Sequence, residues 1–400
     1  MFRFLTAGES HGKALVVIIE GLPAGLPLSE DYLALDLRRR QGGYGRSQRQ
    51  QIEEDRAEIL SGVRHGLTLG SPISLIIQNR DWQNWQDVMQ VETTQEPAKK
   101  LTRLRPGHAD LAGVMKYGQD DVRPILERAS ARETAARVAV GAVARRCLAE
   151  FGSAVHSHTV AGGDVTAAVE GDPPPKADSP QAKPVAEAVE ESPVRCADPE
   201  ASLRMVRAID AARESGDTLG GIFEVWATGV PIGLGSHVHW DRRLDGRLAQ
   251  AVMSIPSVKG VGIGGGFALA GLPGSQAHDV ILPAEQWGDR PWRRATNRAG
   301  GLEGGMTNGE PVIVRAALKP ISTLPKPLPS ADLATGEAIQ AHYERSDICA
   351  VPAAGVIGEA MVAIVLAEAM LEKFGGDHID ETKRNYQAYL KTIGPRGAIE

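Results

Sequence analysis

The segment FRFLTAGESHGKALVVII, residues 2–19, sets a polar, glycine-bounded loop between two apolar runs. Short apolar runs that end at glycine are typical of strands, so we expect strands near Phe2–Thr6 and over Ala14–Ile19. The loop from Gly8 to Gly12, which contains Ser10 and His11, is then held between two strands.

Start and stop signals predict the elements that follow this segment. Ser130, with Glu133 three residues later, has the spacing of a capping box, so we expect a helix from Ser130 through an alanine- and valine-rich stretch to Gly152. The other expected elements are a helix from Ser29 to Arg40, strands over Glu58–Val63 and Pro72–Gln78, a loop to Asp121, a helix from Pro199 to about Ser215, a strand over Gly221–Val230, a helix over Asp245–Ile255, short strands within Gly260–Gly309, a strand over Pro311–Leu318, a helix over Val356–Phe374 and a polar terminal helix. The chain therefore mixes α and β structure.

Length and composition favour a globular protein. The chain has 400 residues, of which 42% are hydrophobic, and this suffices for one large domain or two ordinary ones. The longest apolar stretch, Val351–Met370, is interrupted by Glu359 and Glu368, so we expect no membrane span. The N-terminus lacks the basic and apolar regions of a secretory signal, and we predict a cytoplasmic protein.

The cysteines and one acidic segment carry little functional signal. Cys147, Cys196 and Cys349 are far apart and odd in number, so we expect reduced thiols and no metal site. Residues 165–200 shift to proline, alanine and acidic residues, including Pro173–Pro175. Because such a segment buries little apolar surface, we predict a mobile surface insertion. The alternative is a surface segment that serves as a docking site.

The arginines indicate a different kind of ligand from nucleic acid. They fall on predicted loops and helix ends rather than along one helix face, and they comprise Arg38–Arg40, Arg46, Arg49, Arg105, Arg128 and Arg132. Guanidinium groups placed in this way suit a small ligand with several negative charges, although each arginine alone is also compatible with solvated surface charge. The formal net charge is −6 and no aromatic residues alternate with the arginines, which disfavours nucleic acid.

Nucleotide motifs are weak. The glycine run Gly260–Gly266 lacks the preceding strand and following helix of a dinucleotide fold, and no Walker-type ending occurs.

His11 and His108 each stand beside glycine and close to arginines, so they are candidates for protonating a leaving group or a cofactor. A solvent-facing position is the alternative for each histidine.

Five separated motifs occur in a consistent order along the chain: Gly8–Gly12, Arg105–Asp110, Arg128–Ala135, Lys319–Thr323 and Arg345–Asp347. Together they resemble chorismate synthase, and the resemblance extends from about Phe2 to Lys373. It implies the conversion of 5-enolpyruvylshikimate 3-phosphate to chorismate by trans-1,4 elimination of phosphate, the last shared step towards the aromatic amino acids. Reduced FMN is required although the reaction has no net redox change.

The resemblance also implies an architecture. We expect an α+β fold, a β-α-β sandwich in which helices pack between two antiparallel sheets, and a homotetramer. One domain would span residues 1–375 with the insertion at about 165–200, and residues 376–400 would form a polar helix and tail.

Site residues follow from the resemblance, residue by residue. His11 would protonate the departing phosphate, His108 would protonate or hydrogen-bond the reduced flavin, and Asp347 would assist proton movement. The substrate-binding residues would be Ser10, Arg40, Arg46, Arg49, Arg105, Ser130, Arg132 and Arg345. The FMN-binding residues would be Arg128, Ala129, Ser130, Pro256, Ser257, Gly304, Lys319, Pro320, Ile321, Ser322, Thr323 and Arg345. Arg40 and Arg46 would bind NADP if it is bound, and no metal is expected.

Two departures and two alternatives accompany this interpretation. Pro256 and Ser257 stand where many relatives have a polar residue and alanine, and Asp121–Glu127 replaces a glycine-rich stretch of some relatives. The alternative enzyme is a flavin reductase or other FMN oxidoreductase, and the non-enzymatic alternative is an anion-binding regulatory module. Because no NADPH domain is recognisable, we expect a separate flavin reductase, with NADPH as a possible or indirect reductant.

Overall fold

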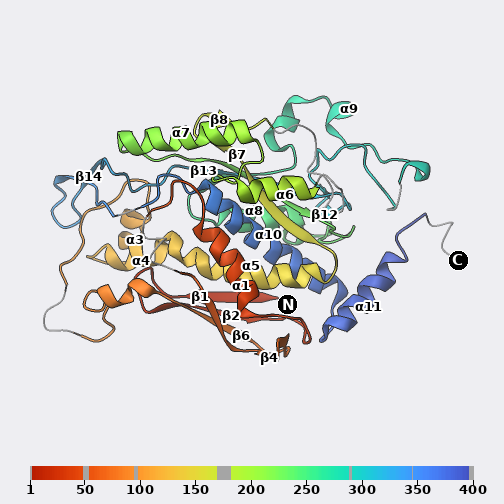
Figure 1. The fold of residues 1–400 in the computed structure, drawn as a ribbon, viewed down its shortest axis with the longest axis horizontal. Helices are drawn as coiled ribbons and strands as arrows, with labels where there is room; N and C mark the ends of the chain where they lie inside the picture. The colour runs from red at the N-terminus through yellow and green to blue at the C-terminus, as the bar shows by residue number, and fades with distance from the viewer. Residues whose placement is uncertain are drawn as a thin grey trace.

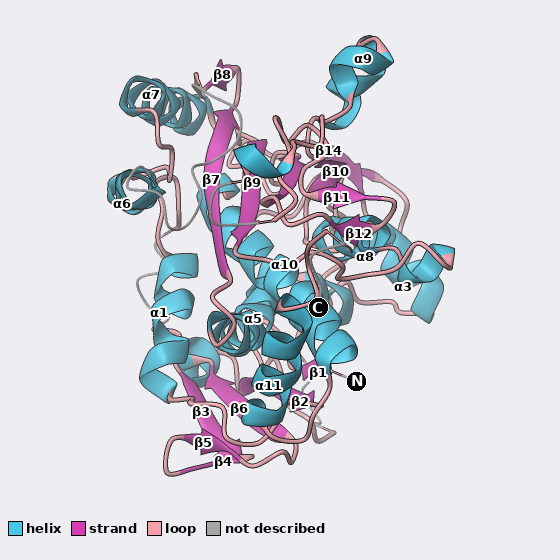
Figure 2. Cartoon of the chain, turned by 90° about the vertical axis from the view of Figure 1, so that its right-hand side faces the viewer, coloured by secondary structure: helices cyan, strands magenta, loops and turns pink. Residues whose placement is uncertain are grey.

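Two antiparallel sheets enclose a layer of helices in the computed structural model (Figure 1). The structure describes residues 2–47, 54–93, 98–168, 182–287, 291–344 and 346–395, with the backbone alone for 182–184. Seen from the side, one sheet lies above the helices and the other below them (Figure 2). The expected β-α-β sandwich is confirmed.

The first sheet has the strand order β1-β2-β6-β3 and carries the N-terminal loop. Its strands are β1 (Arg3–Ala7), β2 (Ala14–Glu20), β6 (Ile73–Gln78) and β3 (Ala57–Ser61). Leu15, Val17 and Ile19 of β2 are buried, whereas Val16 and Ile18 face outward. This alternation gives the sheet one core face, and it fixes the ends of the Gly8–Gly12 loop as predicted.

The second sheet has the order β10-β13-β9-β7-β8. Its strands are β10 (Val258–Ile263), β13 (Val312–Leu318), β9 (Gly221–Thr228), β7 (Ala154–Gly162) and β8 (Val165–Thr166). The sequence did not predict β7, because its polar residues obscure the alternation of a strand. Ser157 and His158 are buried there and bond to Glu359 and Glu224, which compensates for their burial.

Three helices form the middle layer: α1 (Glu30–Gln41), α5 (Thr134–Ala149) and α10 (Val351–Phe374). Their small residues allow close approach, since a Cβ added at Gly141 of α5 would lie 2.2 Å from Ala360 Cβ of α10. By length and composition α10 could cross a membrane, but 89% of its most apolar window is buried inside the protein. A helix that is apolar on every side is typical of a buried core helix, so α10 does not indicate a membrane protein.

The junction before α5 differs from the expected capping box. Ser130 ends α4 (Arg123–Ala129), and its hydroxyl accepts the backbone N–H of Arg132 at the start of a short 3₁₀ turn, Ala131–Glu133. The Glu133 carboxylate instead pairs with Arg137, and α5 itself begins at Thr134. The capping-box prediction was therefore wrong, because the Glu133 side chain is engaged by the arginine one turn later.

The stretch expected as a loop to Asp121 contains regular structure. A 3₁₀ turn spans Arg80–Asn84, and α3 spans Asp110–Tyr117. The helix α10 also begins at Val351, five residues earlier than predicted, with a proline in its first turn. The other predicted helices and strands are present with similar bounds.

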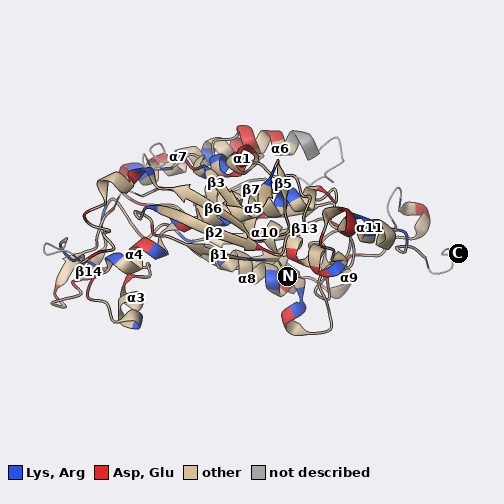
Figure 3. Cartoon of the chain, turned by 90° about the horizontal axis from the view of Figure 1, so that it is seen from below, with Lys and Arg blue, Asp and Glu red and all other residues tan. Residues whose placement is uncertain are grey.

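The remaining elements surround the sandwich. They are the hairpin strands β4 (Val63–Arg64) and β5 (Leu67–Thr68), β11 (Leu302–Glu303) and β12 (Met306–Thr307), β14 (Pro329–Ala331) and β15 (Ala338–Gln340), and the helices α7 (Pro199–Ser215), α8 (Leu244–Met253), α9 (Gly274–Ala277) and α11 (Ile379–Leu390). Basic and acidic residues are interspersed along the elements seen in Figure 3.

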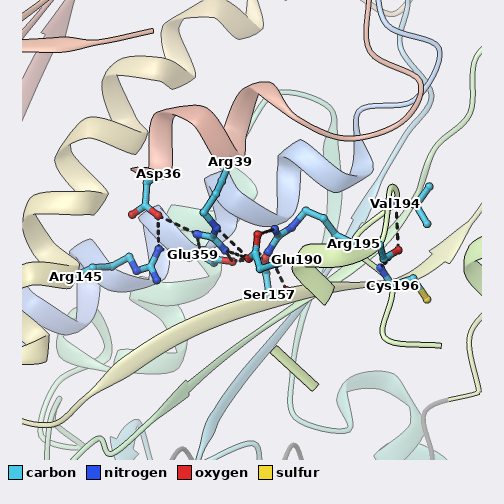
Figure 4. A network of polar contacts seen from close by, with 10 residues as sticks. Asp36, Arg39, Arg145, Ser157, Glu190, Val194, Arg195, Cys196 and Glu359 are labelled. Carbon is cyan, nitrogen blue, oxygen red and sulfur yellow. Dashed lines mark hydrogen bonds and ion pairs between the residues drawn. The ribbon is translucent and has the colours of Figure 1, made fainter. Parts of the chain in front are cut away.

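The second half of the acidic segment is ordered against the core. Residues 169–181 lie outside the described part, but α6 (Ala182–Glu191) follows them, and Val189 and Val194 are buried. Glu190 of α6 bonds to Arg39 and Arg195, which also bond to the buried Glu359 of α10 (Figure 4). This half of the segment therefore differs from the predicted mobile insertion.

Candidate active site

A cavity of about 580 Å³ opens where α4, α5, α10 and the ends of β10 and β13 meet. Its apolar part includes Leu126, Ile255, Leu318, the α10 N-cap residue Ala350 and, from the first turns of α10, Ala353, Ala354 and Ile357. Its polar wall comprises Ser10, Arg40, Arg46, Ser47, Arg105, His108, Ser130, Arg132, Thr134, Ser257, Lys259, Lys319, Ser322, Thr323, Glu344, Ser346 and Asp347. Such a cavity suits a ligand with a flat apolar part and several anionic groups.

Two arginines of this wall share one buried carboxylate, that of Asp55. Asp55 accepts from Arg40 Nη1 at 3.1 Å and also pairs with Arg132. Burial lowers the pKa of Arg40 to about 10, Asp55 opposes that effect, and the positive charges of Arg132 and Arg46 add to it. Because these like charges repel, an anion bound among them would be stabilised.

Arg46 and Asp347 come from opposite ends of the chain and form an ion pair. Arg46 Nη1 donates to Asp347 Oδ2 at 2.6 Å, and the Ser47 backbone N–H donates to Asp347 Oδ1 at 2.7 Å. Arg46 Nε is buried and has no hydrogen-bond partner among the described residues. That nitrogen is a donor available to a ligand in the cavity.

His108 and Arg105 are oriented by Asp110, at the start of α3. Asp110 Oδ1 lies 2.5 Å from His108 Nδ1, and Asp110 Oδ2 accepts from Arg105 Nε at 2.9 Å. Burial alone would raise the pKa of Asp110, but the hydrogen bonds with His108 and Arg105 outweigh it and hold the pKa well below its usual range. Arg105 Nη2 also lies 3.0 Å from His108 Nδ1, but the shorter contact is with a carboxylate, which only accepts, so we place the hydrogen on Nδ1 and leave Nε2 for a ligand.

His11 is held in the same way by a different carboxylate. Its Nδ1 lies 2.9 Å from Glu127 Oε1, its ring stacks on Trp85, and its side chain is almost buried. Ser10, the preceding residue, lies on the cavity wall and accepts a hydrogen bond from Ser130 Oγ at 3.1 Å. His11 is thus adjacent in sequence to the wall rather than part of it.

The remaining sequence-predicted residues divide into three groups. Ala129, Pro256, Ser257, Lys319, Ile321, Ser322 and Thr323 line the cavity, as do Ser130 and the arginines described above. Arg128, Gly304 and Pro320 are not among the described lining residues, and Arg128 instead donates to the Thr6 and Gly8 carbonyl oxygens. Arg49 and Arg345 lie outside the described residues. All these assignments stay predictions.

The sequence interpretation did not single out four acidic residues at the site. Asp55, Asp110 and Glu127 are buried partners of arginine and histidine, and Glu344 lies on the wall. Burial raises the pKa of Glu344, but the His342 hydrogen bond and the charge of Arg123 lower it to about 2. Of these four, only Asp110 could have been found from a local pattern, because it lies close in sequence to Arg105 and His108 and begins the helix α3.

This fold, with a cavity lined by several arginines, is that of an enzyme acting on a small molecule. Comparison with known proteins is more specific: the profile of the chorismate synthase family matches residues 2–371. The chain is 59% identical over 396 residues to the chorismate synthase of Moorella thermoacetica, covering 98% of this chain and all of that one. It is 55% identical to the enzyme of Carboxydothermus hydrogenoformans, covering 98% and 99% of the two chains.

Solved structures agree with the sequence comparison. A crystal structure of chorismate synthase superposes with a TM-score of 0.78 and 46% identity, covering 98% of each chain. The chain belongs to the chorismate synthase family.

The activity is that of a lyase in aromatic amino acid biosynthesis. The reaction eliminates phosphate from 5-enolpyruvylshikimate 3-phosphate to give chorismate. The family requires a reduced flavin for this elimination. The resemblance drawn from five motifs is confirmed.

Proposed function

We propose that FMN is the flavin and that it binds, together with the phosphorylated substrate, in the cavity between α4, α5 and α10. Three observations support this. The volume of about 580 Å³ falls within the range of about 300–1,000 Å³ for small-molecule sites. Ala353, Ala354 and Ile357 of α10 give the cavity an apolar side that suits a ring system. Arg46 Nε is a buried donor without a partner among the described residues.

The arginines of the wall would hold the substrate phosphate and carboxylates. Four of them come from separate parts of the chain. Arg40 belongs to α1 and Arg46 to the loop after it, whereas Arg105 precedes α3 and Arg132 precedes α5. Ser10 and Ser130 lie together on the cavity wall, linked by a hydrogen bond, and would add contacts to the phosphate. By the family resemblance, Arg49 and Arg345 would complete this clamp.

Proton transfer would be divided among three residues. Reduced flavin, when bound, supplies the transient electron donation that weakens the allylic carbon–oxygen bond. His11 would give a proton to the departing phosphate, which offsets the negative charge that develops there. His108 would hold a proton at Nε2 toward the flavin, and Asp347 would accept the proton lost from the substrate ring.

The observation that carries this assignment is the shared geometry of the two histidines. Each has its Nδ1 within 3 Å of a buried carboxylate, Glu127 for His11 and Asp110 for His108. Fixing Nδ1 leaves Nε2 as the atom that exchanges a proton, which is how general acid–base histidines are commonly oriented.

We further propose a cytoplasmic homotetramer that receives reduced FMN from a separate flavin reductase. Support for the reductase is the lack of a recognisable NADPH domain in the sequence. NADPH would be an indirect reductant, with Arg40 and Arg46 as its contacts if it binds.

Three measurements test these proposals. Under anaerobic conditions, chemically reduced FMN should support chorismate formation better than reduced riboflavin, which lacks the phosphate. NADPH with oxidised FMN should give no product until a flavin reductase is added. Equal rates with riboflavin would overturn the FMN assignment, and turnover with NADPH alone would overturn the separate reductase. Light scattering of the purified protein tests the tetramer.

A further inference from the structure

Trp85, Glu127 and Arg123 form one connected cluster around His11, in segments to which the family motifs give no role. Glu127 and Arg123 belong to the stretch 121–127 that departs from the glycine-rich form of some relatives, and Trp85 follows the 3₁₀ turn Arg80–Asn84. We propose that Trp85 and Glu127 are positioning residues that fix the ring of His11 for proton donation. This inference rests on the proposed role of His11.

Glu127 holds both the ring and the backbone of His11. Its carboxylate accepts the His11 backbone N–H at 2.7 Å, and it lies 2.9 and 3.0 Å from Nδ1 of the ring. The Glu127 carbonyl oxygen also accepts the backbone N–H of Ser10 at 3.1 Å. Glu127 therefore fastens the loop that reaches the cavity to α4 through both its backbone and its side chain, and Arg128 adds a hydrogen bond to the Gly8 carbonyl oxygen.

The hydrogen bonds of Glu127 define the tautomer of His11. A carboxylate has no hydrogen to donate, so the hydrogen of this contact is on Nδ1 before and after proton transfer. The proton that is given away must then leave from Nε2. Glu127 is 1% exposed, and Arg123 Nη1 at 3.3 Å supplies the charge partner that a buried carboxylate needs.

Trp85 sets the plane of the ring. The centroids of the His11 and Trp85 rings are 3.9 Å apart with an interplanar angle of 27°. Trp85 is itself held, because its Nε1 donates to Asp81 at 3.0 Å and the Arg123 guanidinium lies 5.1 Å from its ring centroid. Arg123 thus contacts both groups that orient His11, and it also pairs with Glu344 on the cavity wall at 3.0 Å.

The two contacts restrain different motions of the ring. The stack resists tilting of the ring plane, and the Glu127 contact resists rotation about the bond that carries the ring. Nε2 is then the ring nitrogen that the Glu127 contact does not engage. A displacement of about 1 Å can slow an enzyme by about 10²-fold, so losing either restraint should reduce kcat more than substrate binding.

The test compares kcat and KM for substrate with reduced FMN in Trp85→Leu, Trp85→Phe and Glu127→Gln. We expect kcat to fall about tenfold or more in Trp85→Leu and Glu127→Gln, with KM within about threefold. His11 donates two N–H groups, one from its backbone and one from its ring, to the Glu127 carboxylate. Glutamine has a single acceptor oxygen, so one of these two contacts is lost in Glu127→Gln. Trp85→Phe keeps a stacking ring and should recover most of the rate.

Matched controls come from neighbouring residues with no contact to His11 among the described interactions. Trp82 is half-buried in the same turn, and its ring faces Lys13, so Trp82→Leu should leave kcat near the parent value. Glu133 is a buried carboxylate paired with Arg137, and Glu133→Gln controls for loss of a buried charge. If either control lowers kcat as much as its partner variant, general disruption explains the loss and the inference fails.

Combination with His11→Ala separates positioning from other effects. If Glu127 and Trp85 act through His11, adding Glu127→Gln or Trp85→Leu to His11→Ala lowers kcat no further. Losses that multiply would overturn the inference while leaving the role of His11 intact. A His11→Ala variant with near-normal turnover would instead overturn the proposed function of His11, and the positioning role with it.

Discussion

Replacing Glu359 by glutamine should destabilise the protein far more than the same change at Glu190. Glu359 is 1% exposed in the middle of α10, and its oxygens accept from Ser157 at 2.6 Å and from Arg39 at 2.7 and 2.8 Å (Figure 4). Arg145 and Arg195 also reach it, each at 3.2 Å.

The expected magnitude follows from the charge balance of this cluster. Arg39, Arg145 and Arg195 face three carboxylates, those of Glu359, Asp36 and Glu190. A glutamine at 359 leaves one buried positive charge unbalanced and turns an N–H group toward guanidinium donors. Breaking a buried ion pair from one side costs about 3–5 kcal/mol, or about two to four powers of ten in the unfolding equilibrium.

Glu190→Gln is the matched control, because Glu190 contacts Arg39 and Arg195 but has a side chain that is 46% exposed. Solvent screens that pair, so its loss should cost no more than about 1 kcal/mol. Urea unfolding at one fixed protein concentration, followed by tryptophan fluorescence, measures both variants. Similar losses in the two variants would refute the argument from burial.

Acid gives a second readout of the same residue. Burial would raise the pKa of Glu359, but Arg39 and Arg145 outweigh it and hold the pKa far below the ordinary value of 4.5. A depressed folded-state pKa contributes stability that is present above the unfolded pKa and is lost as pH falls below it. The difference in stability between the parent and Glu359→Gln should therefore shrink below about pH 4.5. A difference that grows in acid would contradict this sign.

Three further predictions concern the site and the core. His11→Ala and His108→Ala should each slow turnover by about 10²-fold or more in steady-state assays, the range for general acid–base groups, and a near-normal rate would remove that residue from the mechanism. Asp110→Asn should lower turnover about tenfold or more, because an amide leaves only one acceptor oxygen for His108 and Arg105 where the carboxylate supplies two, and unchanged kinetics would contradict that role. Gly141→Ala should destabilise by about 1–3 kcal/mol in urea unfolding, since the added methyl carbon would lie 2.2 Å from Ala360 Cβ, and an unchanged midpoint would show that the helices separate freely.

Local patterns in the sequence predicted much of the secondary structure. The apolar run Ala14–Ile19 after a glycine-bounded loop and the Ser29 cap identified β2 and α1, because those signals depend on neighbours along the chain. The strand β7 was missed, since its buried Ser157 and His158 are satisfied only by residues of β9 and α10. The arrangement of layers came from the family resemblance rather than from these patterns.

In the site, too, signals between neighbours in sequence could be recognised, whereas contacts between distant segments could not. Arginines and histidines near glycine-rich loops could be selected from the sequence as candidates. Their carboxylate partners could not, because Asp55 and Glu127 stand far along the chain from Arg132 and His11 and meet them only after folding. The predicted capping box failed for a similar reason, as Glu133 has a competing partner in Arg137.

The central claim, that this cavity performs the flavin-dependent elimination, has one direct test. The purified protein is incubated without oxygen with chemically reduced FMN and 5-enolpyruvylshikimate 3-phosphate, and phosphate, chorismate and the absorbance of the flavin are followed together. Phosphate and chorismate should appear in equal amounts while the flavin ends reduced. Absence of both products, or flavin oxidation in proportion to product, would contradict the account.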